Sequence, residues 1–242
     1  MNRFLIILSA CLMNAGISAQ RMDQLPDPGH GDCHTVGKRI MGQLYHPPRH
    51  QARGTPFLND DWMAGMLIFK DLDTVMISSM NYNAYLDEVV YLNKVLNKYI
   101  VIDYQYIQEF MLIPGQGKPA LKFRCQDPDH NIRSKYIQVL LADSVSLFAV
   151  RKVDFVEDEG YPPSAHPDYY HPVSIYYVEK QDSSMVRIKL TKGQLINVFP
   201  DRKKAISRFI RQNHSNLSNE PDLVEVIRFV NIAGPDIQPF LP

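Results

Sequence analysis

Short runs in which apolar and polar residues alternate, separated by turn-forming residues, fill most of the chain after residue 62. Alternation with a period of two predicts half-buried strands, and closely spaced turn signals predict that neighbouring strands are antiparallel. The short segments 71–73, 142–144 and 181–184 each predict a hairpin. The predicted strands are residues 63–70, 74–80, 86–92, 99–102, 107–113, 121–124, 134–141, 145–153, 173–180 and 185–190.

Apolar residues change to a helical spacing after residue 190. Thr191 and Gln194 have the spacing of a capping box at the start of a short helix that must end before Pro200. We expect Asp201 to cap a second helix and Asn219 to begin a third. The apolar stripes of these three helices are Leu195, Val198 and Phe199, then Ala205, Ile206, Phe209 and Ile210, then Leu223, Val226, Ile227 and Val230.

These patterns predict an α+β fold that is mainly β. We expect a curled antiparallel meander sheet, half-barrel or sandwich-like, followed by two to three C-terminal helices that pack on it. Residues 54–190 and 191–242 then form one domain. Residues 20–53 are rich in Pro, His and Gly and predict an extended N-terminal arm, with regular structure beginning at Trp62.

The first 19 residues predict a signal peptide. Arg3 precedes an apolar core, and a run of small residues ends at Ala19, where we expect cleavage. The alternative is lipoprotein processing, because the residues before Cys11 have the types found in a lipobox, although only about seven apolar residues precede it. The sequence therefore predicts export to the periplasm or the extracellular space, or a lipid anchor at Cys11.

The charge balance of the chain narrows the classes of partner that it can bind, and its cysteines allow one disulfide. The chain has 26 Lys and Arg residues and 26 Asp and Glu residues, and this neutral balance argues against nucleic acid as a partner. After residue 19 no run approaches the roughly 20 apolar residues of a membrane-spanning helix. Cys33 and Cys125 remain after the expected cleavage, and an oxidising compartment would allow them to form a disulfide. The sequence leaves open whether they meet.

The chain's only tryptophan, Trp62, follows two adjacent carboxylates, Asp60 and Asp61. A general acid/base pair needs two carboxylates in different environments, whereas an Asn-Asp-Asp run is typical of a turn. We interpret the segment as the corner where the chain enters the sheet, with Gly54, Phe57 and Trp62 as structural anchors. On this interpretation Trp62→Ala costs about 3–5 kcal/mol.

A loop rich in aromatic residues is predicted between residues 157 and 172. Its prolines stiffen it, and aromatic rings with polar tips suit the binding of a sugar or a protein, although a plain crossover loop explains the same residues. His166, Asp168 and His171 could also hold a metal, but nothing fixes their mutual geometry. The candidate binding residues are Tyr161, His166, Asp168, Tyr169, Tyr170 and His171.

Three residues of the arm, His30, Cys33 and His34, are weak candidates for a metal site. Their side chains are common zinc ligands, but the metal itself would have to order a Gly-rich tail. We predict no cofactor.

Catalytic motifs are missing from the sequence. It contains no Gly-x-Ser-x-Gly elbow, no glycine-rich phosphate loop and no His-Glu-x-x-His pair. We therefore predict no enzymatic activity.

The second predicted helix, within residues 201–213, is basic on the side opposite its apolar stripe. That side suits peripheral contact with an anionic membrane, or is simply solvated. Its basic residues are Arg202, Lys203, Lys204, Arg208 and Arg211.

Several short stretches of the sequence resemble the corresponding stretches of a known protein family. They are Gly54 to Leu58 followed by Trp62 and Gly65, the pair Tyr82 and Asn83, Phe110, the pair Tyr176 and Tyr177, and the basic helix after Asp201. Over residues 54–231 the chain resembles uncharacterised exported β-rich proteins of Bacteroidota. The resemblance implies export and a β-rich domain with C-terminal helices, and it supplies no established catalytic residues. The long arm before Gly54 departs from the family's pattern.

The leading hypothesis is an exported, non-catalytic cell-envelope protein that binds another protein or an envelope component such as a glycan. The first alternative is a small-ligand carrier with an apolar pocket in the sheet. The second is a hydrolase of cell-wall or glycan substrates, which would need a cleft with perturbed carboxylates or histidines.

Overall fold

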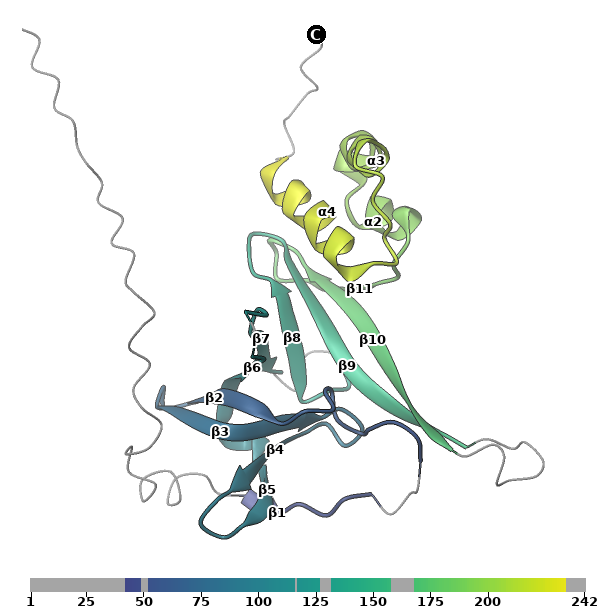
Figure 1. The fold of residues 1–242 in the computed structure, drawn as a ribbon. Coiled ribbons are helices and arrows are strands. Elements are labelled where there is room, and N and C mark those ends of the chain that lie inside the picture. Colours follow the sequence, from purple (N-terminus) through teal and green to yellow (C-terminus); the bar gives the residue numbers. More distant parts are fainter. Residues whose placement is uncertain (1–41, 49–51, 116, 127–131, 158–167, 234–242) are drawn as a thin grey trace, which may run out of the picture. The chain divides into compact units, whose positions relative to one another are not determined.

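The computed structural model describes residues 42–48, 52–115, 117–126, 132–157 and 168–233 (Figure 1). These residues form an antiparallel sheet followed by C-terminal helices, which confirms the predicted α+β, mainly β fold. The strands are β1 (Gly42–Leu44), β2 (Met63–Phe69), β3 (Thr74–Asn83), β4 (Glu88–Asn93), β5 (Lys98–Ile102), β6 (Ile107–Ile113), β7 (Leu121–Cys125), β8 (Tyr136–Leu141), β9 (Ser146–Val156), β10 (Tyr169–Glu179) and β11 (Met185–Ile188). The helices are α2 (Lys192–Val198), α3 (Lys203–Gln212) and α4 (Glu220–Ile232), with short 3-10 turns η1 (Tyr104–Tyr106) and η3 (Pro200–Arg202).

The sheet consists of two meanders joined side by side. The strand order is β1-β5-β4-β3-β2-β6-β7-β8-β9-β10-β11, and all neighbours are antiparallel. The three predicted hairpins, β2–β3, β8–β9 and β10–β11, are confirmed. After β5 the chain returns through η1, and β6 pairs with β2. A pairing between strands this distant in sequence has no local sequence signal.

The sheet is rolled rather than flat. Three strands separate β3 from β8, which in a flat sheet would place them roughly 19 Å apart. Instead, the rings of Tyr82 on β3 and Tyr136 on β8 have centroids 5.9 Å apart. Phe110 and Phe123, from the strands between, stack at 4.5 Å within the same buried cluster. Aromatic rings therefore fill the inside of the roll.

Asp87, in the turn between β3 and β4, holds the rolled sheet closed through hydrogen bonds to its carboxylate. One carboxylate oxygen accepts a hydrogen bond from the Tyr82 hydroxyl at 2.6 Å. The other accepts hydrogen bonds from the Ser134 hydroxyl at 3.2 Å and from the Lys135 backbone N–H. Close by, the Val153 N–H donates to the Ala84 carbonyl at 3.1 Å. These contacts join the first meander to β8 and β9.

Asp87→Asn tests this fastening. Asn tolerates the positive φ of 57° at this position but replaces one acceptor oxygen with a donor that faces other donors. We expect the free energy of unfolding to fall by about 1–2 kcal/mol in urea melts. The matched control, Asp71→Asn in the exposed β2–β3 turn, is expected to cost under about 0.5 kcal/mol. Equal losses for the two variants would contradict the fastening role.

A second core lies between the helices and the β8–β11 part of the sheet (Figure 1). Leu147 and Ala149 of β9 and Val178 of β10 pack against Val226 and Ile227 of α4 within this buried cluster. Both ends of α4 are also tied to the sheet, one to the turn before β9 and the other to β9 itself. Asn231 near its C-terminus bonds both backbone groups of Val145, accepting from the N–H at 2.7 Å and donating to the carbonyl at 2.9 Å. Glu220 at its N-terminus pairs with Arg151.

Three expectations about element boundaries are wrong. Regular structure begins before Trp62, because β1 pairs with β5. Residues 169–172, expected in a loop, belong to β10. The Tyr170 N–H points away from β9 and donates to the Arg53 carbonyl. Pro172 is two residues further along the strand, so its missing N–H would point to the same outer side. No strand pairs with Pro172 there, because β11 pairs with β10 only from Tyr176 onward.

The expected cap of the second helix is the third error. Asp201 lies within η3, and α3 begins only at Lys203, with no side-chain cap. Arg202 was predicted on the exposed basic side of this helix, but it lies in η3 and turns toward α4. Its guanidinium donates to the Val230 carbonyl in the last turn of α4, a favourable position for a cation because that end of a helix carries partial negative charge.

Candidate functional site

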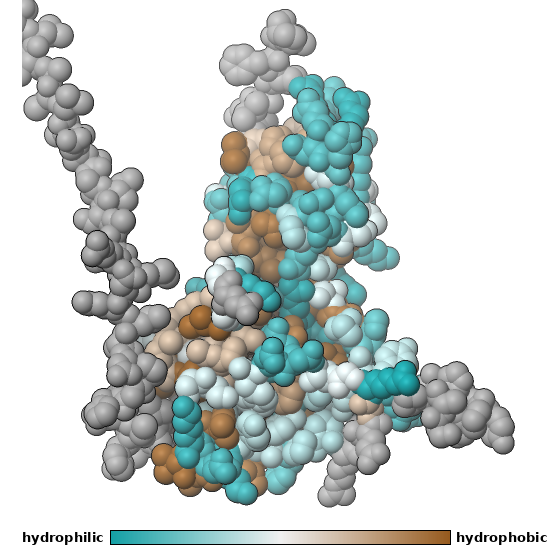
Figure 2. All heavy atoms as spheres, viewed as in Figure 1, coloured by the Kyte–Doolittle hydropathy of each residue, from teal (hydrophilic) through white to brown (hydrophobic). Residues whose placement is uncertain are grey.

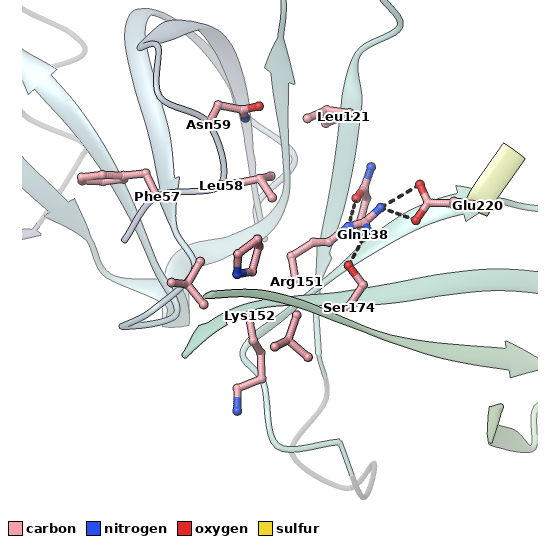
Figure 3. A pocket seen from close by; sticks show the side chains of 12 residues that line it. Phe57, Leu58, Asn59, Leu121, Gln138, Arg151, Lys152, Ser174 and Glu220 are labelled. Atoms are coloured by element: carbon pink, nitrogen blue, oxygen red, sulfur yellow. Dashed lines mark hydrogen bonds and ion pairs between the residues drawn. The ribbon is translucent and has the colours of Figure 1, made fainter. Parts of the chain in front are cut away.

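A cleft of about 280 Å³ opens where the two cores meet (Figure 3). One wall is the segment that leads into β2, and the other is formed by β9 and β10, with the first turn of α4 at one end. The cleft is lined by Phe57, Leu58, Asn59, Leu121, Gln138, Arg151, Lys152, Val153, Pro172, Val173, Ser174 and Glu220.

Arg151 organises the polar end of the cleft. It lies on the inward side of β9, its side chain is 15% exposed, and every guanidinium nitrogen is engaged. Its Nε donates to Gln138 Oε1 at 2.6 Å, and one terminal nitrogen donates to Ser174 Oγ at 2.7 Å. The other terminal nitrogen bonds both carboxylate oxygens of Glu220, at 2.8 and 2.7 Å (Figure 3). These bonds tie the sheet to the helix and use four of the five N–H donors of the guanidinium, and the Glu220 carboxylate neutralises its charge.

Glu220 holds its position through the helix and through a tyrosine. It lies in the first turn of α4, where the partial positive charge of the helix end favours a carboxylate. The Tyr176 hydroxyl donates to its Oε2 at 2.9 Å. Burial raises the pKa of Tyr176, and the neighbouring Glu220 carboxylate raises it further, so this hydroxyl remains a donor at neutral pH.

The opposite wall carries a buried donor without an acceptor. Asn81 is fully buried, and its side-chain amide donates to the backbone carbonyls of Asn59 at 2.8 Å and Asp61 at 3.3 Å, which fixes the wall against β3. The Asn59 Nδ2 group is itself buried and has no hydrogen-bond partner within the described part of the chain. An unsatisfied buried amide costs about 1–3 kcal/mol, which an acceptor on a bound molecule recovers only if the Asn59 side chain turns toward the cleft.

The predicted anchors lie beside this wall. Gly54 has a φ of 83°, which favours glycine, and stands where the chain turns after its bridge to β10. Phe57 and Trp62 are half-buried with ring centroids 5.2 Å apart, and the Trp62 ring packs against Tyr99 at 4.5 Å with the two planes tilted by 36°. Trp62 therefore belongs to an aromatic cluster on the flank of the sheet rather than to the fully buried core.

Because Trp62 lies on the flank of the sheet, Trp62→Ala is expected to lower the free energy of unfolding less than a change in the fully buried core would. Part of the ring stays in water, so we expect a loss of about 2 kcal/mol rather than 3–5. Asp60 is exposed, and Asp60→Ala is expected to cost under about 0.5 kcal/mol. Urea melts of the two variants compare them directly, and a larger loss for Asp60→Ala would contradict the structural interpretation of this corner.

The predicted binding residues do not gather at the cleft. Tyr169 and His171 lie together on the opposite face of β10, with ring centroids 6.5 Å apart. Tyr170 packs against Tyr85 and Phe155. The Asp168 carbonyl accepts from the Arg53 N–H. Tyr161 and His166 lie outside the described residues.

The predicted metal and disulfide residues fall largely outside the described chain. His30, Cys33 and His34 precede it, so the bridge between Cys33 and Cys125 stays a prediction. Cys125 is half-buried at the end of β7, and burial raises the pKa of its thiol. Within the described residues, no three His, Cys, Asp or Glu side chains gather as metal ligands do.

The sequence contained one overlooked signal for this site. Arg151 falls in the predicted strand 145–153 at a position in phase with Val145, Leu147, Ala149 and Val153. A charged residue on the apolar side of a strand is almost always paired when buried, so its position alone predicts a partner. Glu220, Gln138 and Ser174 had no comparable signal, because their relation to Arg151 depends on the tertiary fold.

Comparisons with other proteins supply no family. A scan against protein-family models finds no match, and searches of curated proteins and of solved structures find none either. Across the described residues, no helix has both the length and the hydropathy required to span a bilayer.

Proposed function

We propose that this is an exported, non-catalytic cell-envelope protein that binds another envelope protein through the cleft at Arg151. The observation that carries the proposal is the buried Asn59 amide, which lacks an acceptor beside a wall of apolar side chains. Once the Asn59 side chain turns toward the cleft, a carbonyl of a bound polypeptide segment would satisfy this donor, and an apolar side chain of that segment would cover Leu58 and Val153.

The size and lining of the cleft favour a polypeptide segment over a stored small molecule. Small-ligand pockets usually measure about 300–1,000 Å³ and enclose the ligand, whereas this cleft is smaller and open. The interior of the rolled sheet, where a carrier would hold its ligand, is filled by Tyr82, Phe110 and Phe123. These features support the binding hypothesis over the carrier alternative.

The lining also offers little to a hydrolase. Arg151 and Glu220 neutralise each other, and the Ser174 hydroxyl accepts a hydrogen bond from Arg151. Among the described residues, no histidine or cysteine lines the cleft. Export and envelope location rest on the predicted signal peptide of residues 1–19 and on the resemblance to exported proteins of Bacteroidota.

Asn59→Asp tests the proposal at the residue that carries it. It keeps the size of the side chain but replaces the unpaired donor with an acceptor, so we expect partner binding to weaken about 10- to 100-fold. The measurement is quantitative mass spectrometry of proteins that co-purify with the tagged chain from its own cells. Asn97→Asp, in an exposed turn, is the matched control.

The expected result is a protein recovered with the wild-type chain and with Asn97→Asp but lost with Asn59→Asp. Equal recovery with all three chains would contradict a role for the cleft. Native mass spectrometry of the same preparations gives a second check, because a small molecule retained by the wild-type chain would favour the carrier.

A further inference from the structure

Helix α3 has two chemically distinct sides. Ile206 is fully buried in the second core, and the Phe209 ring stacks on Phe229 of α4 at 4.4 Å. On the other side of α3, Lys204, Arg208 and Arg211 are three to four positions apart and share one side of the helix, with Lys203 at its edge. These residues, all exposed, are Lys203, Lys204, Arg208 and Arg211, and we call them the α3 basic face.

The charges of this face are held in no ion pair among the described residues, and the nearest acid in the sequence is the exposed Asp201 in η3. Helix α3 contains no acidic residue, and none of the four cations forms an ion pair within the described part of the chain. Two acids of the neighbouring helix are already engaged, since Glu225 pairs with Arg228 and Asp222 accepts from the Asn216 N–H. Figure 2 shows hydrophilic residues covering the outer side of α3.

The positive charge is concentrated in this part of the protein. Residues 185–233 contain nine Lys and Arg against four Asp and Glu, whereas the whole chain has equal numbers of both. The balanced total therefore conceals a basic C-terminal end. A field of this kind attracts anionic surfaces.

We propose that the α3 basic face docks the protein onto an anionic phospholipid bilayer. The four cations extend over about 12 Å along the helix, a length suited to several lipid headgroups at once. The apolar side of α3 is occupied by α4, so the helix lies on the headgroups without inserting, and the attraction is electrostatic. Each basic side chain near such a surface strengthens binding about fivefold, and salt weakens it. This docking does not depend on the cleft.

Vesicle co-sedimentation tests the proposal with the full chain. The vesicles are phosphatidylethanolamine with a quarter phosphatidylglycerol, and vesicles of phosphatidylcholine serve as the neutral comparison. The variant replaces all four residues of the α3 basic face with Gln. The control variant replaces four exposed lysines elsewhere, Lys70, Lys94, Lys98 and Lys118, with Gln. Both variants lose the same charge and keep the same N-terminus.

We expect the partition coefficient on anionic vesicles to fall a few hundredfold for the α3 variant and about tenfold or less for the control. We also expect wild-type binding to weaken steeply with added salt. Equal losses in the two variants, or equal binding of the wild-type chain to neutral vesicles, would overturn the proposal. Binding to a DNA duplex but not to anionic vesicles would overturn it in favour of a nucleic-acid partner.

Discussion

Phe110→Ala is expected to lower the free energy of unfolding by about 4 kcal/mol. Phe110 is fully buried at the centre of the rolled sheet. Its ring stacks on Phe123 at 4.5 Å and meets Tyr136 edge-on at 5.2 Å, with Tyr82 at 5.8 Å. Truncation removes the ring that these three side chains surround and leaves a cavity. The strands of the two meanders cannot move together to fill it without disrupting the rolled sheet.

Urea denaturation followed by circular dichroism measures this loss. Tyr106→Ala is the matched control, because Tyr106 is an aromatic residue in η1 next to β6 and is 44% exposed. We expect the control to cost under about 1 kcal/mol. Similar losses for the two variants would mean that the sheet is not rolled around Phe110.

Arg151→Ala is expected to cost about 3 kcal/mol, because it leaves Glu220 without its partner in a largely buried position. The same change removes the donors to Gln138 and Ser174. Since Glu220 begins α4, the loss should loosen the N-terminal end of that helix from β9. Hydrogen exchange of the first turns of α4 is expected to accelerate in this variant, along with a lower urea midpoint.

Two further variants separate charge from geometry. Lys152→Ala removes a cation from the next position of β9, where the side chain is 47% exposed and its ion pair with Asp154 is 3.8 Å long, so it should cost under about 0.5 kcal/mol. Arg151→Lys keeps the charge but loses the planar fork, and we expect it to recover only part of the stability. Full recovery with Lys would contradict the importance of the three-partner geometry.

Most strands were readable from the sequence because they face an apolar core on at least one side, whereas β1, which is exposed along its whole length, was not. Along β10, the buried Tyr176 and Val178 alternate with the less buried Tyr177 and Glu179, and this period of two is a local property. The pairing of β2 with β6 and the closure at Asp87 are not local. They depend on contacts such as Asp87 with Lys135, which are distant in sequence and leave no periodic pattern.

Composition misled the interpretation of β10. Prolines and aromatic residues around Pro172 suggested a loop, but a strand at an exposed edge tolerates proline when its missing N–H faces outward. The same error placed Tyr169, Tyr170 and His171 on one binding surface. In a strand they alternate, so Tyr170 packs inward while Tyr169 and His171 face the other side.

Site-specific photo-crosslinking in the native cells tests most directly whether the cleft binds a partner. A photoreactive amino acid replaces Pro172, which lines the cleft, or His171, which points to the opposite face of the same strand. We expect a discrete protein adduct from position 172 and none from position 171. An adduct from position 171 alone would contradict this expectation. It would place the binding surface on the face of β10 that carries Tyr169 and His171.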